Sequence, residues 1–294
     1  MRIRASVLAL GLAALTLVPA APARAQLKLP RISPNATVTQ TIGITDLTVT
    51  YSRPGVKGRT VWGDIVPMDK PWRAGANEAT RFTTTDEITF GGQKLAAGTY
   101  ALIAIPGKDE WTIALNSEKE LWGAYEYKPE KDVLRVKVKP EAAPHEEWLS
   151  FSFDGLAPAT ATSMPNATNL VLRWEKLRVA VPVSVDANAT ILAGCRKAVG
   201  EAKPDDFRTR VQAARWCLDS GVNMDEARGW MTQAVAIQKN YSTLGLQARF
   251  LAKEGKKQEA IAAGEAAVAA GKASPDKPDT SAIEKLVAEW KAAK

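Results

Sequence analysis

The feature that most constrains the fold is an alternation of apolar and polar residues with a period of two, which runs from Asn35 to Val185. Its segments are rich in Val, Ile, Thr and aromatic residues, and Gly, Pro, Asn and Asp separate them, as is typical of short half-buried strands. No helical periodicity intervenes. The pattern predicts about nine or ten strands in an antiparallel β-sandwich or jelly roll, rather than a parallel α/β sheet. The segments are ATVTQTIG, DLTVTYS, ATRFTTTDEITF, GTYALIAIP, EWTIALN, DVLRVKVKP, EWLSFSFDGL and TNLVLRWEKLRVAVPVSV.

Two short connections predict hairpins between these strands. Gly91-Gly92 lies between two strand segments, and paired glycines favour the tight turn of a two-residue hairpin. Pro106-Gly107-Lys108-Asp109 joins two apolar runs in the same way and predicts a second hairpin.

The composition changes after Pro182, where alanine becomes frequent, β-branched residues become fewer and apolar residues recur at spacings of three and four. Gly221 and Gly255 stand where helices are expected to end, and Pro204 and Asp205 where one is expected to begin. The pattern predicts an all-α region after the β region. The expected helices cover 187–200, 206–220, 224–239, 242–254, 256–270 and 281–293.

Two segments of the helical half, CLDSGVNMDEARGWMTQAVAIQKN and FLAKEGKKQEAIAAGEAAVAAGK, align with an offset of 33 residues. Tetratricopeptide repeats (TPR) have a period of about 34 residues. The alignment superimposes Ala227 on Ala260 and Ala234 on Ala267, which predicts small buried residues where helices cross. The typical Trp-x-x-Leu-Gly opening and closing proline are missing, so an unrelated alanine-rich bundle remains the alternative to degenerate TPR-like repeats.

The N-terminus has the pattern of a secretory signal peptide. Arg2 and Arg4 precede an apolar run over 5–18, and an A-x-A site ends at Ala25. That run is shorter than the roughly 20 residues that cross a bilayer, and no other segment is long and apolar enough for a membrane span. We expect cleavage after Ala25 and a periplasmic or secreted protein. The expected organisation is a signal peptide over 1–25, a β domain over 26–185 and a helical domain over 186–294.

Charge and rare residues exclude several classes of function. The formal net charge of +7 falls to +4 without Arg2, Arg4 and Arg24, and both signs alternate along the chain, unlike the basic stripe of a nucleic-acid binder. One histidine, His145, and two cysteines, Cys195 and Cys217, give no common zinc site or histidine-assisted serine nucleophile. No calcium loop is present. We expect no metal and no cofactor. Two buried free thiols are favoured for Cys195 and Cys217, and a disulfide between them is the alternative.

The stretch from Tyr51 to Phe82 carries the candidate binding residues. It holds three prolines, four glycines, two tryptophans and four arginines, and turns packed this closely fix side chains on a scaffold. Guanidinium groups suit carboxylate, phosphate or sulfate, and tryptophan faces suit sugars. In the alternative interpretation the arginines bind loop carbonyls and the tryptophans fill the core. The predicted ligand-binding residues are Arg53, Arg59, Trp72, Arg73 and Asn77.

The amino-acid sequences of several segments resemble those of a known family. SRPGVKGR, WGDIVP, WRAGANEAT, LAAGTYALIAIPGKDEWTIALN and WGAYEY are similar to bacterial exported proteins catalogued as domain of unknown function 2911, over residues of about 32 to 185. The resemblance implies a β-rich extracytoplasmic domain that is often followed by helical repeats. It implies no catalytic residues.

Three hypotheses of function follow. The first is an exported, non-catalytic binding protein with an anionic or carbohydrate ligand in the β domain and a protein partner docked on the helical repeats. The second is an extracytoplasmic carbohydrate-active hydrolase, which needs two carboxylates facing a sugar bond. The third is a structural β domain with function only in the helices. The acidic candidates for hydrolysis are Asp64, Glu78, Asp86 and Glu87.

Overall fold

The computed structural model describes residues 29–156 and 165–293. The chain groups into two compact units, Met1–Ile32 and Ser33–Lys294, and the fold described below belongs to the second. The expected signal peptide and its cleavage site lie outside the described residues.

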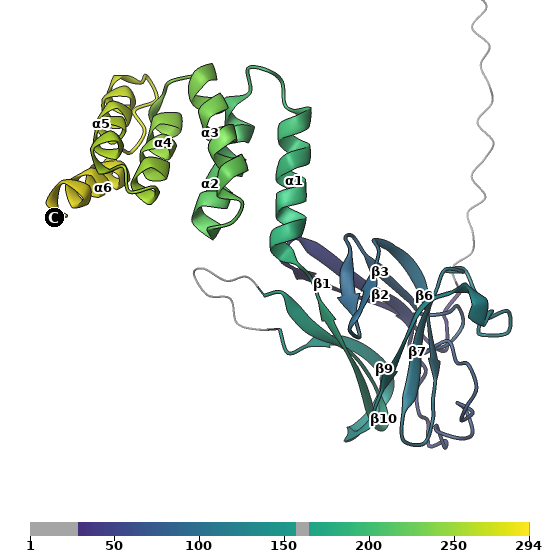
Figure 1. Ribbon diagram of the computed structural model, residues 1–294. Helices are drawn as coiled ribbons and strands as arrows, with labels where there is room; N and C mark the ends of the chain where they lie inside the picture. Colours follow the sequence, from purple (N-terminus) through teal and green to yellow (C-terminus); the bar gives the residue numbers. More distant parts are fainter. Residues whose placement is uncertain (1–28, 157–164, 294) are drawn as a thin grey trace, which may run out of the picture. The chain divides into compact units, whose positions relative to one another are not determined.

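An antiparallel, sheet-rich region comes first and helices follow it, as predicted (Figure 1). The strands form two sheets and no closed barrel. The six-stranded sheet has the order β1 (Asn35–Ile42), β2 (Thr45–Ser52), β3 (Arg81–Thr84), β6 (Gly98–Ile105), β7 (Trp111–Asn116) and β8 (Asp132–Val138). The four-stranded sheet has the order β5 (Gln93–Leu95), β4 (Ile88–Phe90), β10 (Ala167–Ser184) and β9 (Glu141–Asp154).

Both predicted hairpins are confirmed. Gly91 and Gly92 join β4 to β5 with positive φ angles of 56° and 83°, a conformation that suits a two-residue hairpin and that glycine adopts without strain. The loop 106–110 joins β6 to β7.

A cluster of four tryptophans lies in the main core. The inward-facing sides of the two sheets enclose this core. Trp62 meets Trp111 edge to face with ring centroids 5.0 Å apart, and it meets Trp72 and Trp174 in the same way. Trp72 stacks on Trp174 at 6.0 Å. Such pairs contribute about 0.5–1.5 kcal/mol beyond their burial. Because Trp62 and Trp72 belong to the turn-dense stretch, the cluster fixes that stretch to both sheets.

Backbone hydrogen bonds hold the same stretch against the sheet. The amide of Trp72 donates to the carbonyl of Ala104 at 2.7 Å, and the amide of Ala104 donates back at 2.8 Å. The amide of Leu102 donates to the carbonyl of Thr80. The segment between Trp72 and Thr80 is therefore a fixed part of the scaffold, although it contains no regular strand.

All six predicted helices are confirmed, with ends shifted by three residues or fewer. Asp206 caps α2 by accepting from the amides of Arg208 and Thr209, and Gly221 ends α2 in the left-handed conformation. Asn240 forms a capping box with Thr243 at the start of α4. The helices are α1 (Ala187–Glu201), α2 (Phe207–Ser220), α3 (Met224–Ile237), α4 (Tyr241–Lys253), α5 (Lys257–Ala273) and α6 (Ser281–Ala292).

The four alanines of the predicted repeat, Ala227, Ala234, Ala260 and Ala267, are each 0% exposed. Their predicted burial is confirmed, and the helices are consistent with the suggested repeats. Independent folding of the 26–185 and 186–294 segments stays a prediction.

Burial of these alanines yields a test of the helix packing. Replacing Ala260 with Leu forces extra methylenes into a close-packed site and should lower the free energy of unfolding by about 1–3 kcal/mol. The same change at Ala262, which is exposed, should cost well under ~1 kcal/mol. Thermal melts of both variants of the full-length mature chain make the comparison. Equal losses would contradict the repeat register.

Candidate functional site

The segment 117–128, which we name the covering loop, lies across part of the outer face of the six-stranded sheet. In β6, Leu102 and Ala104 belong to the main core, whereas Ala101 and Ile103 belong to a second, smaller cluster. Successive side chains of a strand point to opposite faces, so the second cluster marks the outer face. Leu121 of the covering loop packs in that cluster and shields this part of the sheet from water.

The covering loop is paired with the turn-dense stretch. The amide of Ala79 donates to the carbonyl of Leu121 at 2.9 Å, and the amide of Gly123 donates to the carbonyl of Asn77 at 3.2 Å. Gly123 has a φ angle of +71°, which glycine adopts most easily. Two segments far apart in sequence, 77–79 and 121–123, thus lie side by side.

A buried carboxylate holds the other end of the covering loop. Asp132, whose side chain is only 4% exposed, accepts hydrogen bonds from the Tyr127 hydroxyl at 2.5 Å and from Arg135 Nε at 2.6 Å. Its second oxygen accepts from Asn116 Nδ2 at 2.7 Å. Burial, together with the bond to Asp132 and the negative charge of Asp132, raises the pKa of Tyr127 to about 12. The loop is therefore fixed at both ends.

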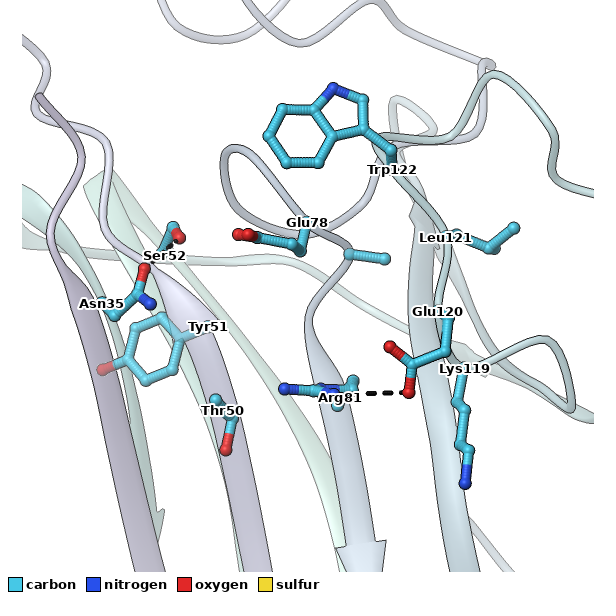
Figure 2. Close-up of a pocket in the computed structure, with 11 residues that line it drawn as sticks. Asn35, Thr50, Tyr51, Ser52, Glu78, Arg81, Lys119, Glu120, Leu121 and Trp122 are labelled. Carbon is cyan, nitrogen blue, oxygen red and sulfur yellow. Dashed lines mark hydrogen bonds and ion pairs between the residues drawn. The ribbon is translucent and has the colours of Figure 1, made fainter. Parts of the chain in front are cut away.

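A cavity of about 260 Å³ lies where the covering loop stops and the open part of the outer face begins. Strands β2 and β3 supply its floor through Thr50, Ser52 and Arg81, and the covering loop supplies a wall through 119–122. Figure 2 shows the Trp122 ring at one end and the Glu78 carboxylate extending towards Ser52 and Asn35. The lining residues are Asn35, Thr50, Tyr51, Ser52, Glu78, Ala79, Arg81, Lys119, Glu120, Leu121 and Trp122.

The cavity is polar and carries both signs of charge. Arg81 lies 3.5 Å from Glu120, with side chains 40% and 73% exposed (Figure 2), so the pair is solvated and weak. Ser52 Oγ donates to Asn35 Oδ1 at 2.8 Å. Trp122 is 60% exposed, which leaves much of its ring accessible to a ligand. Such a lining offers donors, acceptors and one flat apolar face within a small volume.

Two of the predicted site residues bind backbone carbonyls through their guanidinium groups. Arg53 Nε donates to the carbonyl of Leu149 at 2.8 Å. Arg59 donates to the carbonyls of Gly55 and Val56 at 2.7 and 3.1 Å. These bonds are those of the alternative interpretation, in which the arginines support the loop.

Of the other three predicted site residues, Trp72 and Asn77 donate side-chain hydrogen bonds to backbone carbonyls. Trp72 is buried, and its Nε1 donates to the carbonyl of Gly75 at 3.2 Å. Asn77, with a φ angle of +58°, donates a side-chain bond to the carbonyl of Ser33. Arg73 Nε is buried without a hydrogen-bond partner in the described structure. None of the five predicted residues lines the cavity, and ligand binding by them stays a prediction.

One of the four acidic candidates, Glu78, lines the cavity. Glu87 pairs with Lys94 at 3.0 Å, Asp86 accepts from the Thr85 hydroxyl, and Asp64 is exposed. The sequence did not point to Glu120, Lys119 or Trp122 as cavity residues. An exposed tryptophan beside a glycine in a polar segment, as in WGAYEY, was the one available signal.

Within the described residues, no group of three or more His, Cys, Asp or Glu side chains is placed to hold a metal ion. Cys195 and Cys217 are free thiols, and burial raises the pKa of both. Among the helices of the described chain, none is both long and apolar enough to cross a membrane.

The fold and the cavity define a two-sheet antiparallel β protein with a small polar site beside an exposed tryptophan, followed by a helical region. The family model described as "Protein of unknown function (DUF2911)" matches residues 33–183, which is more than half of the chain. The chain therefore belongs to this family, as its sequence motifs implied. No curated protein and no solved structure matches the chain.

The bond between Tyr127 and Asp132 yields a test with a defined pH dependence. Tyr127→Phe removes a donor from a buried carboxylate and should lower the free energy of unfolding by about 1–3 kcal/mol at pH 7. Because folding raises the pKa of Tyr127 to about 12, its contribution is complete below an unfolded pKa of ~10 and is lost as the pH rises towards 12.

Urea unfolding at pH 7, 9 and 11 checks this expectation, and the cost of Tyr127→Phe should shrink at pH 11. Tyr125→Phe is the control, since Tyr125 is 85% exposed and should change stability by less than ~0.5 kcal/mol. A cost that is independent of pH would show that the hydroxyl does not act through its bond to Asp132.

Proposed function

We propose that the β region is a non-catalytic binding module of an exported protein and that its cavity binds a sugar unit. The observation that carries the proposal is the exposed Trp122 ring above a floor of hydroxyl, amide and charged groups. A sugar presents an apolar face of C–H groups and a rim of hydroxyls, which an amphipathic tryptophan and mixed polar groups can contact together. Export is supported by the sequence pattern of residues 1–25.

The size and charge of the cavity favour a small neutral ligand. Its volume of about 260 Å³ is below the roughly 300–1,000 Å³ of sites for drug-sized molecules, which suits one sugar residue or the end of a chain. Arg81 and Lys119 are balanced by Glu78 and Glu120 around the same space. An anionic ligand would favour an excess of cationic groups, so a neutral sugar fits better.

Hydrolysis is supported less well, although two carboxylates line the cavity. A glycosidase needs one carboxyl group kept protonated by a buried or strongly perturbed environment. Glu120 is 73% exposed and lies beside Arg81, which is the environment of a solvated ion pair. Binding without catalysis therefore accounts better for this arrangement.

Trp122 provides the direct test of the site. Trp122→Ala should weaken binding of the best ligand in a screen of neutral envelope glycans by at least about tenfold, or ~1.4 kcal/mol, because it removes the stacking face. Tyr125→Ala is a matched control, since Tyr125 is an exposed aromatic residue of the same loop that does not line the cavity. Isothermal titration calorimetry gives both affinities. Full affinity in a folded Trp122→Ala variant, or no glycan bound by the wild type, would contradict the site.

A second function, docking of a protein partner, is favoured by a groove on the helices. Two cavities of about 420 and 440 Å³ share Arg215, Tyr241 and Ser242 and run along α2 and α4. Arg208 and Arg215 line the groove and form no ion pair among the described residues, whereas Arg196, Arg228 and Arg249 all pair with carboxylates. Arg215 donates to the Ser242 hydroxyl at 3.3 Å, and Arg208 lies over the Phe207 ring. Because neither has a carboxylate partner among the described residues, both favour an acidic segment of the partner.

An acidic peptide tests this groove. Fluorescence anisotropy with a labelled ten-residue poly-glutamate peptide should show binding that Arg208→Ala/Arg215→Ala weakens by about tenfold or more. Lys197→Ala/Lys285→Ala removes the same charge from exposed positions that do not line the groove, and should lower the affinity much less. Equal losses in both variants would indicate a general charge effect and would contradict a specific groove.

A further inference from the structure

The part of the outer face that the covering loop leaves open is lined with threonines. We name it the threonine face. Its side chains come from alternate positions of four adjacent strands, so they point to the same side of the sheet as Ala101 and away from the main core. Figure 1 shows these strands, β1, β2, β3 and β6, next to one another. The members of the threonine face are Thr37, Thr39, Thr48, Thr50, Thr83 and Thr99.

The strand registers align four of these threonines in one row. Thr39 is opposite Thr48, Thr48 is opposite Thr83, and Thr83 is opposite Thr99. Adjacent strands are about 4.8 Å apart, so the row places hydroxyl groups at regular intervals across the sheet. The neighbouring row continues from Thr37 through Thr50 to Arg81.

The hydroxyls are satisfied only in part by one another. The pairs Thr39–Thr48 and Thr83–Thr99 have oxygens 3.0 Å apart, and Thr37–Thr50 has oxygens 3.3 Å apart. A hydroxyl has one donor proton and two acceptor positions, so each pair can direct a donor and several acceptors outwards. Their neighbours across the strands hold them in a fixed geometry.

The threonine face is continuous with the cavity, because Thr50 belongs to both and Arg81 follows Thr50 in the same row. The row of Thr39, Thr48, Thr83 and Thr99 holds no charged side chain, and the charges that flank it on the same face, Asp46 and Arg81, have opposite signs. The face therefore offers little net charge to an acidic peptide or a nucleic acid, both of which are bound through charge. It also has no large apolar side chain that would bind a hydrophobic partner. A regular hydroxyl surface that carries little net charge suits a neutral chain of sugars.

We propose that the threonine face extends the cavity site, so that a neutral polysaccharide places its end sugar beneath Trp122 and lays the following sugars over Thr48 and Thr83. The inference rests on the proposed sugar binding in the cavity and adds the chain form of the ligand. Affinity then depends on chain length, since each further sugar gains hydrogen bonds to the row.

The test uses the mature full-length chain and neutral oligomers of glucose, of xylose and of N-acetylglucosamine, each of one to six units. In calorimetry the wild type should bind six units at least tenfold more tightly than one unit of the same sugar. Thr48→Val/Thr83→Val keeps the β-branched shape and removes two hydroxyls; it should bind one unit like the wild type and lose the dependence on length. Thr112→Val, on β7 outside the threonine face, is the control and should keep that dependence.

The outcomes separate the two proposals. Binding of single sugars without dependence on length overturns the threonine face and leaves the cavity intact. Dependence on length that persists in the double variant also overturns it. No binding of any oligomer by the wild type overturns the proposed function and the inference together. If the double variant does not fold in circular dichroism, Thr99→Val, which removes one hydroxyl of the same row, replaces it with the same expected direction.

Discussion

The packing of four tryptophans is the interaction on which the rest of the β region depends. Trp62 and Trp72 bring the turn-dense stretch into the core against Trp111 of β7 and Trp174 of β10. Because that packing fixes the stretch, its exit towards β3 has a defined path. Asn77 and Ala79 can then pair with the covering loop, and that loop in turn forms the wall of the cavity. The covering loop, which forms one wall of the cavity, has no regular secondary structure. The buried tryptophan cluster thus positions this wall indirectly, through the turn-dense stretch.

The covering loop also divides the outer face of the six-stranded sheet into two parts. Over β6 and β7 it buries Ala101, Ile103 and Ala114 under Leu121. This part of the outer face therefore forms a second, smaller hydrophobic core. Over β2 and β3 the face stays open and is polar. The cavity lies at the boundary between these two parts, where the covering loop meets the open face of β2 and β3. The exposed Trp122 ring and the strand hydroxyls therefore line the same space. The proposed binding function requires no perturbed catalytic group at this boundary.

Much of the fold could be predicted from the sequence because its signals are local. Alternation within a strand, Gly91-Gly92 in a hairpin and Asp206 at a helix start each depend on neighbours a few residues away. The buried alanines followed from a repeat with an offset of 33 residues. The cavity could not be predicted in this way, since Thr50, Arg81 and Glu120 meet only through strand register and the path of the covering loop.

Residue type alone also did not predict which aromatic and arginine side chains are held in the scaffold and which are free to contact a ligand. Trp72 and Trp122 both stand in turn-rich segments, yet Trp72 is 6% exposed and Trp122 is 60% exposed. Both residues form an isolated backbone bridge, Trp72 with Ala104 and Trp122 with Glu78. Their environments differ because the Trp72 ring packs against Trp62 and Trp174 in the core, whereas the Trp122 ring lies at the open cavity. Arg53 and Arg59 have the chemistry of anion ligands, but nearby backbone carbonyls bind Nε of Arg53 and two nitrogens of Arg59. Whether a guanidinium group binds a backbone carbonyl or a ligand depends on the tertiary structure.

Nuclear magnetic resonance of the tryptophan indoles tests the central claim, that the cavity beside Trp122 binds a neutral sugar, most directly. The chain has nine tryptophans, and each indole N–H gives a separate signal in a ¹⁵N-labelled protein. On addition of a bound oligosaccharide, the signal of Trp122, assigned by its loss in Trp122→Phe, should shift while those of the buried Trp72, Trp111 and Trp174 stay in place. A shift that spares Trp122 and appears at another indole would contradict the account.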